Sequence, residues 1–281
     1  MNSRFEQFIQ QGIYLRNWST RTVRTYRQGL KRLPTEIPTK SQLDAWVVQM
    51  RQDGLTPGGC NMYIRTINSY LSWLHEGKDL DQPLKVKLLR APQKQLTLLS
   101  DSDIRAILAF RPRNRAQRRT WTLVLLLLDT GIRISEALGI QGNKLDLDQM
   151  MVVVFGKGAK ERVVPFSHEM RKVLYRWLQS ARGRDSSYVF STYSGSGLTY
   201  RNAFRDVSVL MRRVGITKRV HPHLFRHQFA SCYVRKGGDI YRLSRLLGHT
   251  AVGTTQIYLR SLGLTDLRSG QERLTPLRLG A

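Results

Sequence analysis

The sequence has few of the features that mark secreted or membrane proteins. It contains two cysteines, Cys60 and Cys232, and their spacing fits neither a metal site nor a redox motif. The longest apolar run, Trp121 to Leu128, is well short of the roughly 20 residues that a helix needs to span a bilayer. The N-terminus lacks the charged and then apolar pattern of a signal peptide. These absences predict a reducing, cytoplasmic location and no membrane partner.

Acidic residues are also scarce. The chain of 281 residues has 20 Asp and Glu against 46 Lys and Arg, which gives a net charge of +26 and a pI near 10.9. A surplus of this size exceeds what solubility requires, so a polyanion is the natural partner, and a nucleic acid is favoured over an anionic membrane. Because the surplus is present both before and after Gln95, both halves of the chain are expected to contact nucleic acid.

Residues 1–80 are predicted to form a small all-α domain. Four stretches carry apolar residues at helical spacing, and the second follows a candidate N-cap, Ser19. Basic residues on the opposite face of this second helix are expected to contact DNA, although a merely solvated helix face is the alternative. These residues are Arg21, Arg24 and Lys31.

Residues 81–99 lose helical periodicity and are predicted to be a basic linker that crosses the DNA backbone. Their candidate contacts are Lys85, Lys87 and Arg90. Ser100 followed by Asp103 then has the pattern of a capping box, which predicts the start of a second domain over residues 100–260.

The second domain is predicted to be mainly α-helical with a small antiparallel β-sheet. Helical patterns cover 104–110, 117–130, 170–178 and 199–214, and a short helix follows Gly131 near Arg133. Two β-branched runs, 151–155 and 161–166, flank GKGAK, which predicts a hairpin with Lys157 at its tip. Residues 188–191 are a further candidate strand.

The predicted helix over residues 199–214 carries arginines on one face. Its apolar residues recur at helical spacing on another face, which predicts that the helix packs on the domain and leaves the arginines exposed. We expect this helix to lie in a DNA groove. The arginines are Arg201, Arg205 and Arg212.

The stretch from His221 to Arg260 gathers a phenol that can attack, cations that can hold a phosphate, and imidazoles that can exchange protons. Taken singly, such residues are weak signals, because an isolated His or Tyr is more often structural. Their order along the chain is more informative. The motifs are Arg133 in TGIRISEAL, Lys157 in GKGAKERVVP, His223 and Arg226 in HPHLFRHQFAS, His249 in LLGH, and Tyr258 in TTQIY.

With these motifs in this order, the chain resembles the tyrosine recombinases, the phage-integrase and Xer-like family. The resemblance covers residues 97–260 by motif, whereas the N-terminal half is similar to the core-binding domain of the family by pattern only. It implies a two-domain, C-shaped clamp around double-stranded DNA. The chain is similar to the simpler members, which lack the extra arm-site domain of lambda-type integrases.

The resemblance also implies roles for the matched residues. Tyr258 would attack a scissile phosphate and form a 3′-phosphotyrosyl link, so that the enzyme cuts and rejoins DNA strands. Arg133 and Arg226 match the arginine pair that holds the non-bridging oxygens. Forked guanidinium donors suit that task because they present a fixed positive charge to the transition state.

Three further residues match the remaining family positions. Lys157 would protonate the departing 5′-oxygen, His223 would give acid–base help at the nucleophile, and His249 would donate a hydrogen bond to the phosphate. Glu136 lies three residues after Arg133, so the two could form only a helix salt bridge; alternatively, Glu136 orients the arginine.

The family acts without a cofactor, and no metal-ligand spacing or nucleotide loop occurs in the sequence. The resemblance implies a homotetramer on two paired DNA sites in a prokaryotic nucleoid, with accessory DNA-bending proteins as a further partner class. Residues 261–281 are expected to contact a neighbouring protomer. Because Gly263, Gly270 and Pro276 interrupt this tail, a long docking helix is not expected.

Three other functions compete with this interpretation. A type IB topoisomerase-like enzyme would share the Tyr, Arg and Lys chemistry but would relax supercoils. A metal-dependent HUH-type nicking enzyme is suggested only by His221-Pro222-His223. A DNA-binding protein with an inactive site is the third, although every catalytic position of the motif is filled.

Overall fold

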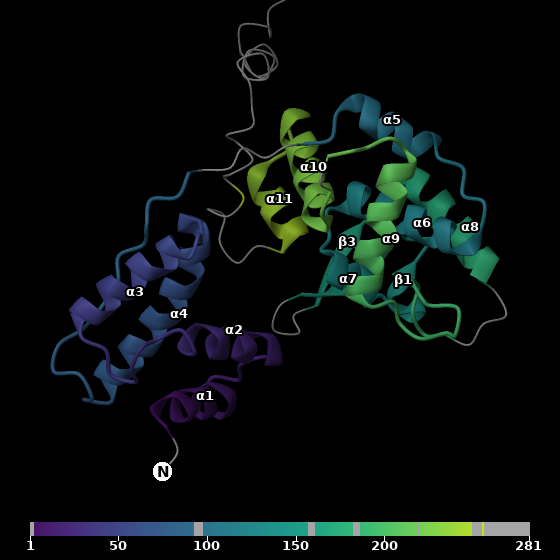
Figure 1. Ribbon diagram of the computed structural model, residues 1–281. Helices are drawn as coiled ribbons and strands as arrows, with labels where there is room; N and C mark the ends of the chain where they lie inside the picture. Colours follow the sequence, from purple (N-terminus) through teal and green to yellow (C-terminus); the bar gives the residue numbers. More distant parts are fainter. Residues whose placement is uncertain are drawn as a thin grey trace, which may run out of the picture. The chain divides into compact units, whose positions relative to one another are not determined.

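The computed structural model, shown in Figure 1, describes residues 3–92, 98–156, 161–181, 186–218, 220–248 and 255. The chain divides into two compact units, Met1–Lys94 and Gln95–Ala281. We call them the helical unit and the larger unit. Each has a hydrophobic core of its own.

The helical unit contains four helices, each of which begins after a Ser or Thr. The side-chain oxygens of Ser3, Ser19, Thr39 and Thr56 accept hydrogen bonds of 3.2–3.3 Å from backbone N–H groups of the first turn, which would otherwise be unpaired. The predicted cap at Ser19 is therefore confirmed. The helices are α1 (Arg4–Tyr14), α2 (Thr20–Leu30), α3 (Lys40–Gln52) and α4 (Pro57–Glu76).

The segment that follows α4 is attached to it. The side-chain amide of Asn68 exchanges two hydrogen bonds of 2.9 Å with the backbone of Val86, and Asn61 does the same with Leu89 at 2.7 and 2.8 Å. Val86 itself is buried in the core of the helical unit. The first part of the expected linker 81–99 therefore packs on the helical unit, and the division between the units falls after Lys94.

The larger unit is built around one buried helix. The run Trp121–Leu128 lies in α6, whose residues Leu123–Leu127 are buried against α8, α9 and α10, so this run is a core helix as expected. The helices are α5 (Asp101–Ala109), α6 (Arg115–Thr130), α7 (Ile134–Leu138), α8 (His168–Ala181), α9 (Tyr200–Arg213), α10 (Pro222–Arg235) and α11 (Ile240–Leu247), with a 3-10 turn at Gly142–Lys144.

A three-stranded antiparallel sheet in the order β1-β2-β3 completes the larger unit. Its strands are β1 (Leu145–Asp146), β2 (Met151–Phe155) and β3 (Glu161–Pro165). The predicted hairpin and the mainly helical fold class are confirmed. The strand expected at 188–191 is wrong, because this segment makes only two single bridges, one to Gln141 and one within its own loop, so no ladder forms.

Two helices of the larger unit end at left-handed glycines. Gly131 closes α6 and Gly248 closes α11, each with φ of 65°. A Cβ on Gly131 would lie 2.3 Å from Cδ1 of Phe229, so both the backbone conformation and the contact with α10 require glycine. In the sequence, Gly131 lies two residues before Arg133, and Gly248 directly precedes His249. Within the described ranges, no helix is both long and apolar enough to cross a membrane.

Candidate active site

A buried carboxylate lies at the centre of the candidate site. Glu136, on the first turn of α7, is only 4% exposed. Its Oε1 accepts from Nη1 of Arg133 at 2.8 Å and from Nη1 of Arg162 at 2.9 Å. Its Oε2 accepts from the backbone N–H of Arg133 and from Nη2 of Arg162, both at 2.8 Å. One negative charge is thus shared by two guanidinium groups, which leaves a net positive charge.

The Glu136 carboxyl is ionised in this setting. Burial is the largest single influence on its pKa and acts to raise it, but the hydrogen bonds and positive charge of Arg162, together with the bonds from Arg133, outweigh burial. The pKa of Glu136 therefore lies below its ordinary value.

Arg133 is held by Glu136 but remains accessible. Its side chain is 31% exposed, compared with 15% for Arg162 and 2% for Glu136. The helix salt bridge considered from the sequence does form. Because Arg162 shares the same carboxylate, however, the salt bridge orients Arg133 without cancelling the positive charge of the cluster.

Arg226 approaches from a different part of the chain. It lies on α10, is 4% exposed, and donates from Nη1 to the carbonyl oxygen of Gly131 at 3.0 Å and from Nη2 to that of Leu247 at 2.7 Å. These carbonyls terminate α6 and α11, where the helix dipoles favour a cation. The side chain of His223, one turn earlier on α10, is exposed.

Arg133 and Glu136 thus form one hydrogen-bonded cluster with Arg162, and Arg226 binds the carbonyl of Gly131, two residues before Arg133. Lys157, His249 and Tyr258 lie outside the described residues. Their flanks are defined: β2 ends two residues before Lys157, and the left-handed Gly248 immediately precedes His249. Thr255, three residues before Tyr258, is fully buried.

The His-Pro-His sequence belongs to a helix start. His221 is the N-cap of α10 and Pro222 its first residue. This placement does not match the strand-borne histidine pair of a HUH-type nicking enzyme. In the described part of the chain, no three His, Cys, Asp or Glu side chains gather at a spacing that could hold a metal ion.

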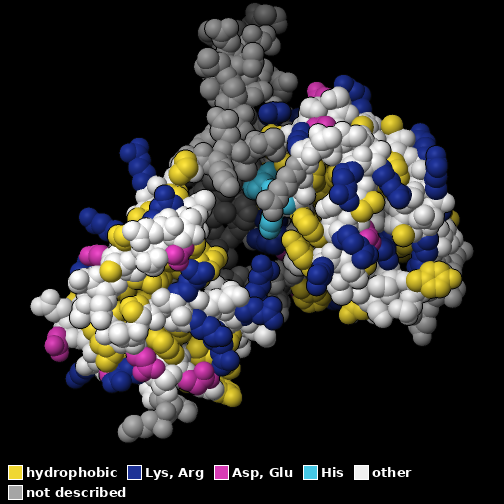
Figure 2. All heavy atoms as spheres, in the orientation of Figure 1, with side chains coloured by type: hydrophobic (Ala, Val, Ile, Leu, Met, Phe, Trp, Pro, Cys, Tyr) yellow, Lys and Arg dark blue, Asp and Glu magenta, His cyan; other side chains and the backbone are white. Residues whose placement is uncertain are grey.

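The candidate DNA-contacting residues are all exposed. Arg21 and Arg24 lie on α2, and Lys31 is its C-cap, while the segment anchored on α4 carries Lys85, Lys87 and Arg90. On α9 the exposed residues are Arg201, Arg205 and Arg212, and Arg205 pairs with Asp206 at 3.2 Å. Figure 2 shows Lys and Arg spread over the visible face of the larger unit with few Asp and Glu among them.

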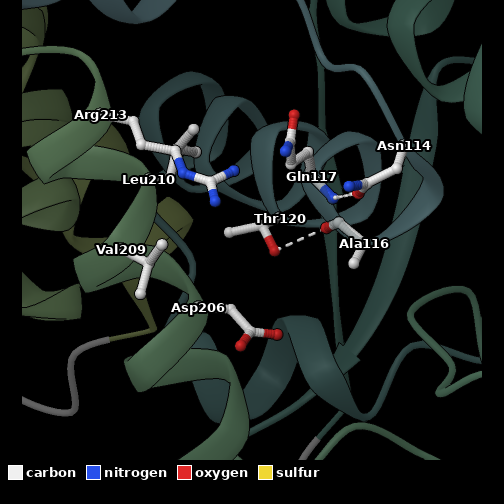
Figure 3. Close-up of a pocket in the computed structure, with 8 residues that line it drawn as sticks. All are labelled: Asn114, Ala116, Gln117, Thr120, Asp206, Val209, Leu210 and Arg213. Carbon is white, nitrogen blue, oxygen red and sulfur yellow. Dashed lines mark hydrogen bonds between the residues drawn. The ribbon is translucent and has the colours of Figure 1, made fainter.

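A small cavity between α6 and α9 is separate from this set of residues. Its volume is about 180 Å³ and its walls include Asn114, Gln117, Asp206 and Arg213, as Figure 3 shows. Asp206 also receives a 3.0 Å hydrogen bond from Arg119, so it joins α9 to α6. None of the residues that line this cavity is a candidate catalytic residue.

Arg162 is a residue of this site that was not predicted from the sequence. This residue pairs with buried Val154 across the β2–β3 hairpin and lies on the same strand face as buried Val164. Strand alternation therefore points an arginine toward the core, where a buried charge needs a partner. The inward position of Arg162 in the strand pattern could therefore have indicated a buried ion pair.

Comparison with known proteins identifies the family. Residues 97–263 match the phage integrase family. Tyrosine recombinase XerC of Xanthomonas campestris pv. campestris (strain B100) is 32% identical over 222 residues, which cover 78% of this chain and 68% of XerC. Tyrosine recombinase XerD of Listeria monocytogenes serovar 1/2a is 26% identical over 278 residues, which cover 92% of this chain and 94% of XerD.

Solved structures show the same fold. The Tn1549 transposon integrase in complex with a circular intermediate DNA superposes with a TM-score of 0.80 at 18% identity, over 98% of this chain and 100% of that one. The XerH recombinase bound to a palindromic difH substrate gives a TM-score of 0.73 at 18% identity, over 98% and 84%. The chain belongs to the phage integrase family, and it is a tyrosine-type site-specific recombinase that cleaves and rejoins DNA.

His227, which follows Arg226 on α10, is expected to make the stability of the protein depend on pH. Burial, followed by the nearby charges of His223, His221 and Arg226, lowers the pKa of His227 from 6.5 to about 4. The unfolded chain therefore binds more protons between these values, so the free energy of unfolding falls as pH falls. Between pH 7 and pH 5 this group should remove about 1–2 kcal/mol of stability.

Urea unfolding of wild type and His227→Gln at the two pH values measures this effect. The glutamine variant should lose less stability between pH 7 and pH 5 than wild type. His168→Gln, at an exposed position on α8, should keep the wild-type pH dependence. Equal losses in wild type and His227→Gln would contradict the prediction.

Proposed function

We propose that this recombinase cuts DNA with Tyr258 and holds the scissile phosphate between Arg133 and Arg226. The observation that carries the proposal is where these two arginines are anchored: Arg133 is bound to Glu136, and Arg226 to the carbonyl of Gly131, two residues before Arg133. Two arginines far apart in the sequence, one at the start of α7 and one on α10, are thereby anchored on neighbouring residues of the chain.

The reaction requires such a cluster. The phenolic oxygen of Tyr258 forms a bond to phosphorus, the bond from phosphorus to the 5′-oxygen breaks, and the phenolic proton is lost while the 5′-oxygen gains one. A phenol with a pKa near ~10 is a weak nucleophile at neutral pH, and the phosphodiester is itself an anion. Fixed guanidinium groups stabilise the charge that develops on the non-bridging oxygens.

The remaining matched residues complete the proton transfers. We assign Lys157 to protonation of the 5′-oxygen, His223 to proton exchange near Tyr258, and His249 to a hydrogen bond with the phosphate. His223 is exposed at the start of α10, one turn from buried Arg226, and this position supports its assignment to proton exchange. The phosphotyrosyl bond conserves the energy of the broken bond, so religation needs no ATP.

Covalent trapping tests the proposal. Incubated in EDTA with nicked fragments from its own genetic neighbourhood, the protein should give a covalent adduct on denaturing gels, and mass spectrometry should map it to Tyr258. The adduct should disappear in Tyr258→Phe, which lacks the attacking oxygen. An adduct on another tyrosine, or persistence of the adduct in Tyr258→Phe, would show that the assignment is wrong.

Arg226→Ala should lower the cleavage rate by about 10²-fold or more, because it removes a fixed cation from the transition state. DNA affinity should stay within about tenfold, since one cation among many is lost. The rate is measured in single-turnover trapping, and affinity by filter binding. Arg235→Ala, at the exposed end of the same helix, is the matched control and should cleave normally.

Because Arg226 is buried, its alanine variant could lose activity by unfolding. Arg226→Lys keeps the cation but not the fork that bonds to Gly131 and Leu247, and it should also cleave slowly while it remains folded by circular dichroism. Wild-type cleavage by either variant would contradict the proposed role.

We further propose that four protomers act on two paired sites and that residues 261–281 contact a neighbouring protomer. A groove of about 720 Å³ between α5, α6, α8 and α10 supports such a contact. Its walls include Ile104, Leu125, Val173 and Phe229, and the tail offers six leucines at positions 262, 264, 267, 274, 277 and 279. Apolar side chains of this kind would be buried on docking.

Deletion of residues 261–281 should abolish four-protomer complexes on paired sites, counted by native mass spectrometry, and leave single-site binding intact. Leu108→Asp should do the same, because Leu108 lines the groove and is 51% exposed, so the isolated protomer tolerates the charge. If four-protomer complexes persist in the shortened chain, the contact between protomers lies elsewhere. The same conclusion would follow if the tail were found to bind the groove of its own protomer.

We also propose a location and further partners for the enzyme. We place the enzyme in the cytoplasm on nucleoid DNA, held by the basic residues of both units, with accessory DNA-bending proteins as a further partner class. The exposed arginines of α2 and α9 are the proposed contacts to the duplex.

A further inference from the structure

We infer that Arg162 is a positioning residue for DNA cleavage, which sets the orientation and the net charge of Arg133 and fixes the end of α11. This inference rests on the proposed roles of Arg133 and Tyr258. Arg162 is on β3 and within the GKGAKERVVP motif, but it was matched to no family role, and none of the proposed proton transfers uses it.

The strand register forces Arg162 into the interior. It lies opposite Val154 in the β2–β3 ladder, and both Val154 and Val164 on the same face are buried. The Arg162 side chain is 15% exposed. A guanidinium group in such a place is tolerated only when its hydrogen bonds are made, and Glu136 provides the opposite charge.

Arg162 binds Glu136 through a fork and α11 through its third nitrogen. Nη1 and Nη2 donate to the two carboxylate oxygens at 2.9 and 2.8 Å, and Nε donates to the carbonyl oxygen of Leu246 at 3.1 Å. All three nitrogens of the planar group are engaged, so its orientation is fixed. A lysine has a single nitrogen and cannot bridge the same three acceptors.

The fork determines the state of Arg133. Each Glu136 oxygen that accepts from Arg162 also accepts from Arg133, so Arg162 fixes the place of the carboxylate that orients Arg133. Charge matters as well. With Arg162 present, two cations share one anion, and the surplus charge is located at Arg133, the more exposed of the two. Without Arg162, Glu136 would neutralise Arg133 in a one-to-one pair.

The third bond of Arg162 acts on α11. Leu246 and Leu247 present consecutive carbonyls at the C-terminus of this helix, and Arg162 and Arg226 each take one of them. Such carbonyls lack partners within the helix, and their partial negative charge favours cations. A Cβ on Gly248 would lie 3.0 Å from Cζ of Arg162, so the arginine also packs closely on the residue that precedes His249.

Single-turnover trapping of Arg162→Met and Arg162→Lys tests the inference. At saturating protein, each variant should form the Tyr258 adduct about 10²-fold more slowly than wild type, because a cation displaced by about 1 Å loses its effect on the transition state. DNA binding should change by less than about threefold, since Arg162 contacts protein groups. Arg171→Met breaks an exposed ion pair with Asp148 on the surface of α8 and is the control expected to cleave normally.

A substrate with a methylphosphonate at the scissile position separates positioning from a general loss of structure. Its uncharged phosphorus centre places less demand on the arginines, so the defect of Arg162→Met should shrink by about tenfold or more on this substrate. A variant that is merely less folded would show the same defect on both substrates, and that result would overturn the inference. Full activity of Arg162→Lys would also overturn it, because charge without the fork would then be sufficient.

The outcome for wild type distinguishes failure of the proposed function from failure of the inference about Arg162. If wild type gives no Tyr258 adduct, the proposed function fails. If wild type cleaves and Arg162→Met cleaves equally well, only the inference about Arg162 fails.

Discussion

The candidate site depends on one buried carboxylate that is shared by two arginines. Burial of an isolated, ionised Glu136 in the core would cost several kcal/mol of folding free energy. The four hydrogen bonds that it accepts from Arg133 and Arg162 offset that cost. The arrangement also has an electrostatic consequence, because one anion cannot neutralise two cations. The surplus positive charge is built into the fold and does not depend on bound DNA, so under the proposed function the cluster has its charge in place before the anionic phosphate binds.

Helix ends provide the second constraint. Arg226 is bound by the carbonyls that terminate α6 and α11. Arg162 is bound by the carbonyl of Leu246, one residue before the end of α11. Each of these helices stops at a left-handed glycine, Gly131 or Gly248. Glycine is required there because other residues rarely adopt this conformation and, at Gly131, because Phe229 leaves no space for a Cβ. The same backbone features therefore end the helices and hold the cations.

Much of the local structure could be predicted from residue patterns. Caps such as Ser19 and Ser100, the glycine stops, and the hairpin depend on interactions within a few residues, so the pattern carries the information. The prediction failed at residues 188–191, where an apolar stretch lies in a loop because its pairing partners are single residues elsewhere. The extended segment after α4 was also not expected to pack on that helix, since its anchors, Asn61 and Asn68, lie 28 and 18 residues away from their partners.

Residue patterns were enough to predict the fold class, most of the helices and the family, because these follow from local periodicity, turn chemistry and a fixed order of motifs. The balance of charges in the site, by contrast, follows from tertiary packing. Arg162 and Glu136 are 26 residues apart, and Arg226 lies 95 residues from the carbonyl that it binds. Contacts over such separations depend on how α6, α7, β3, α10 and α11 pack together, and no local pattern encodes that packing.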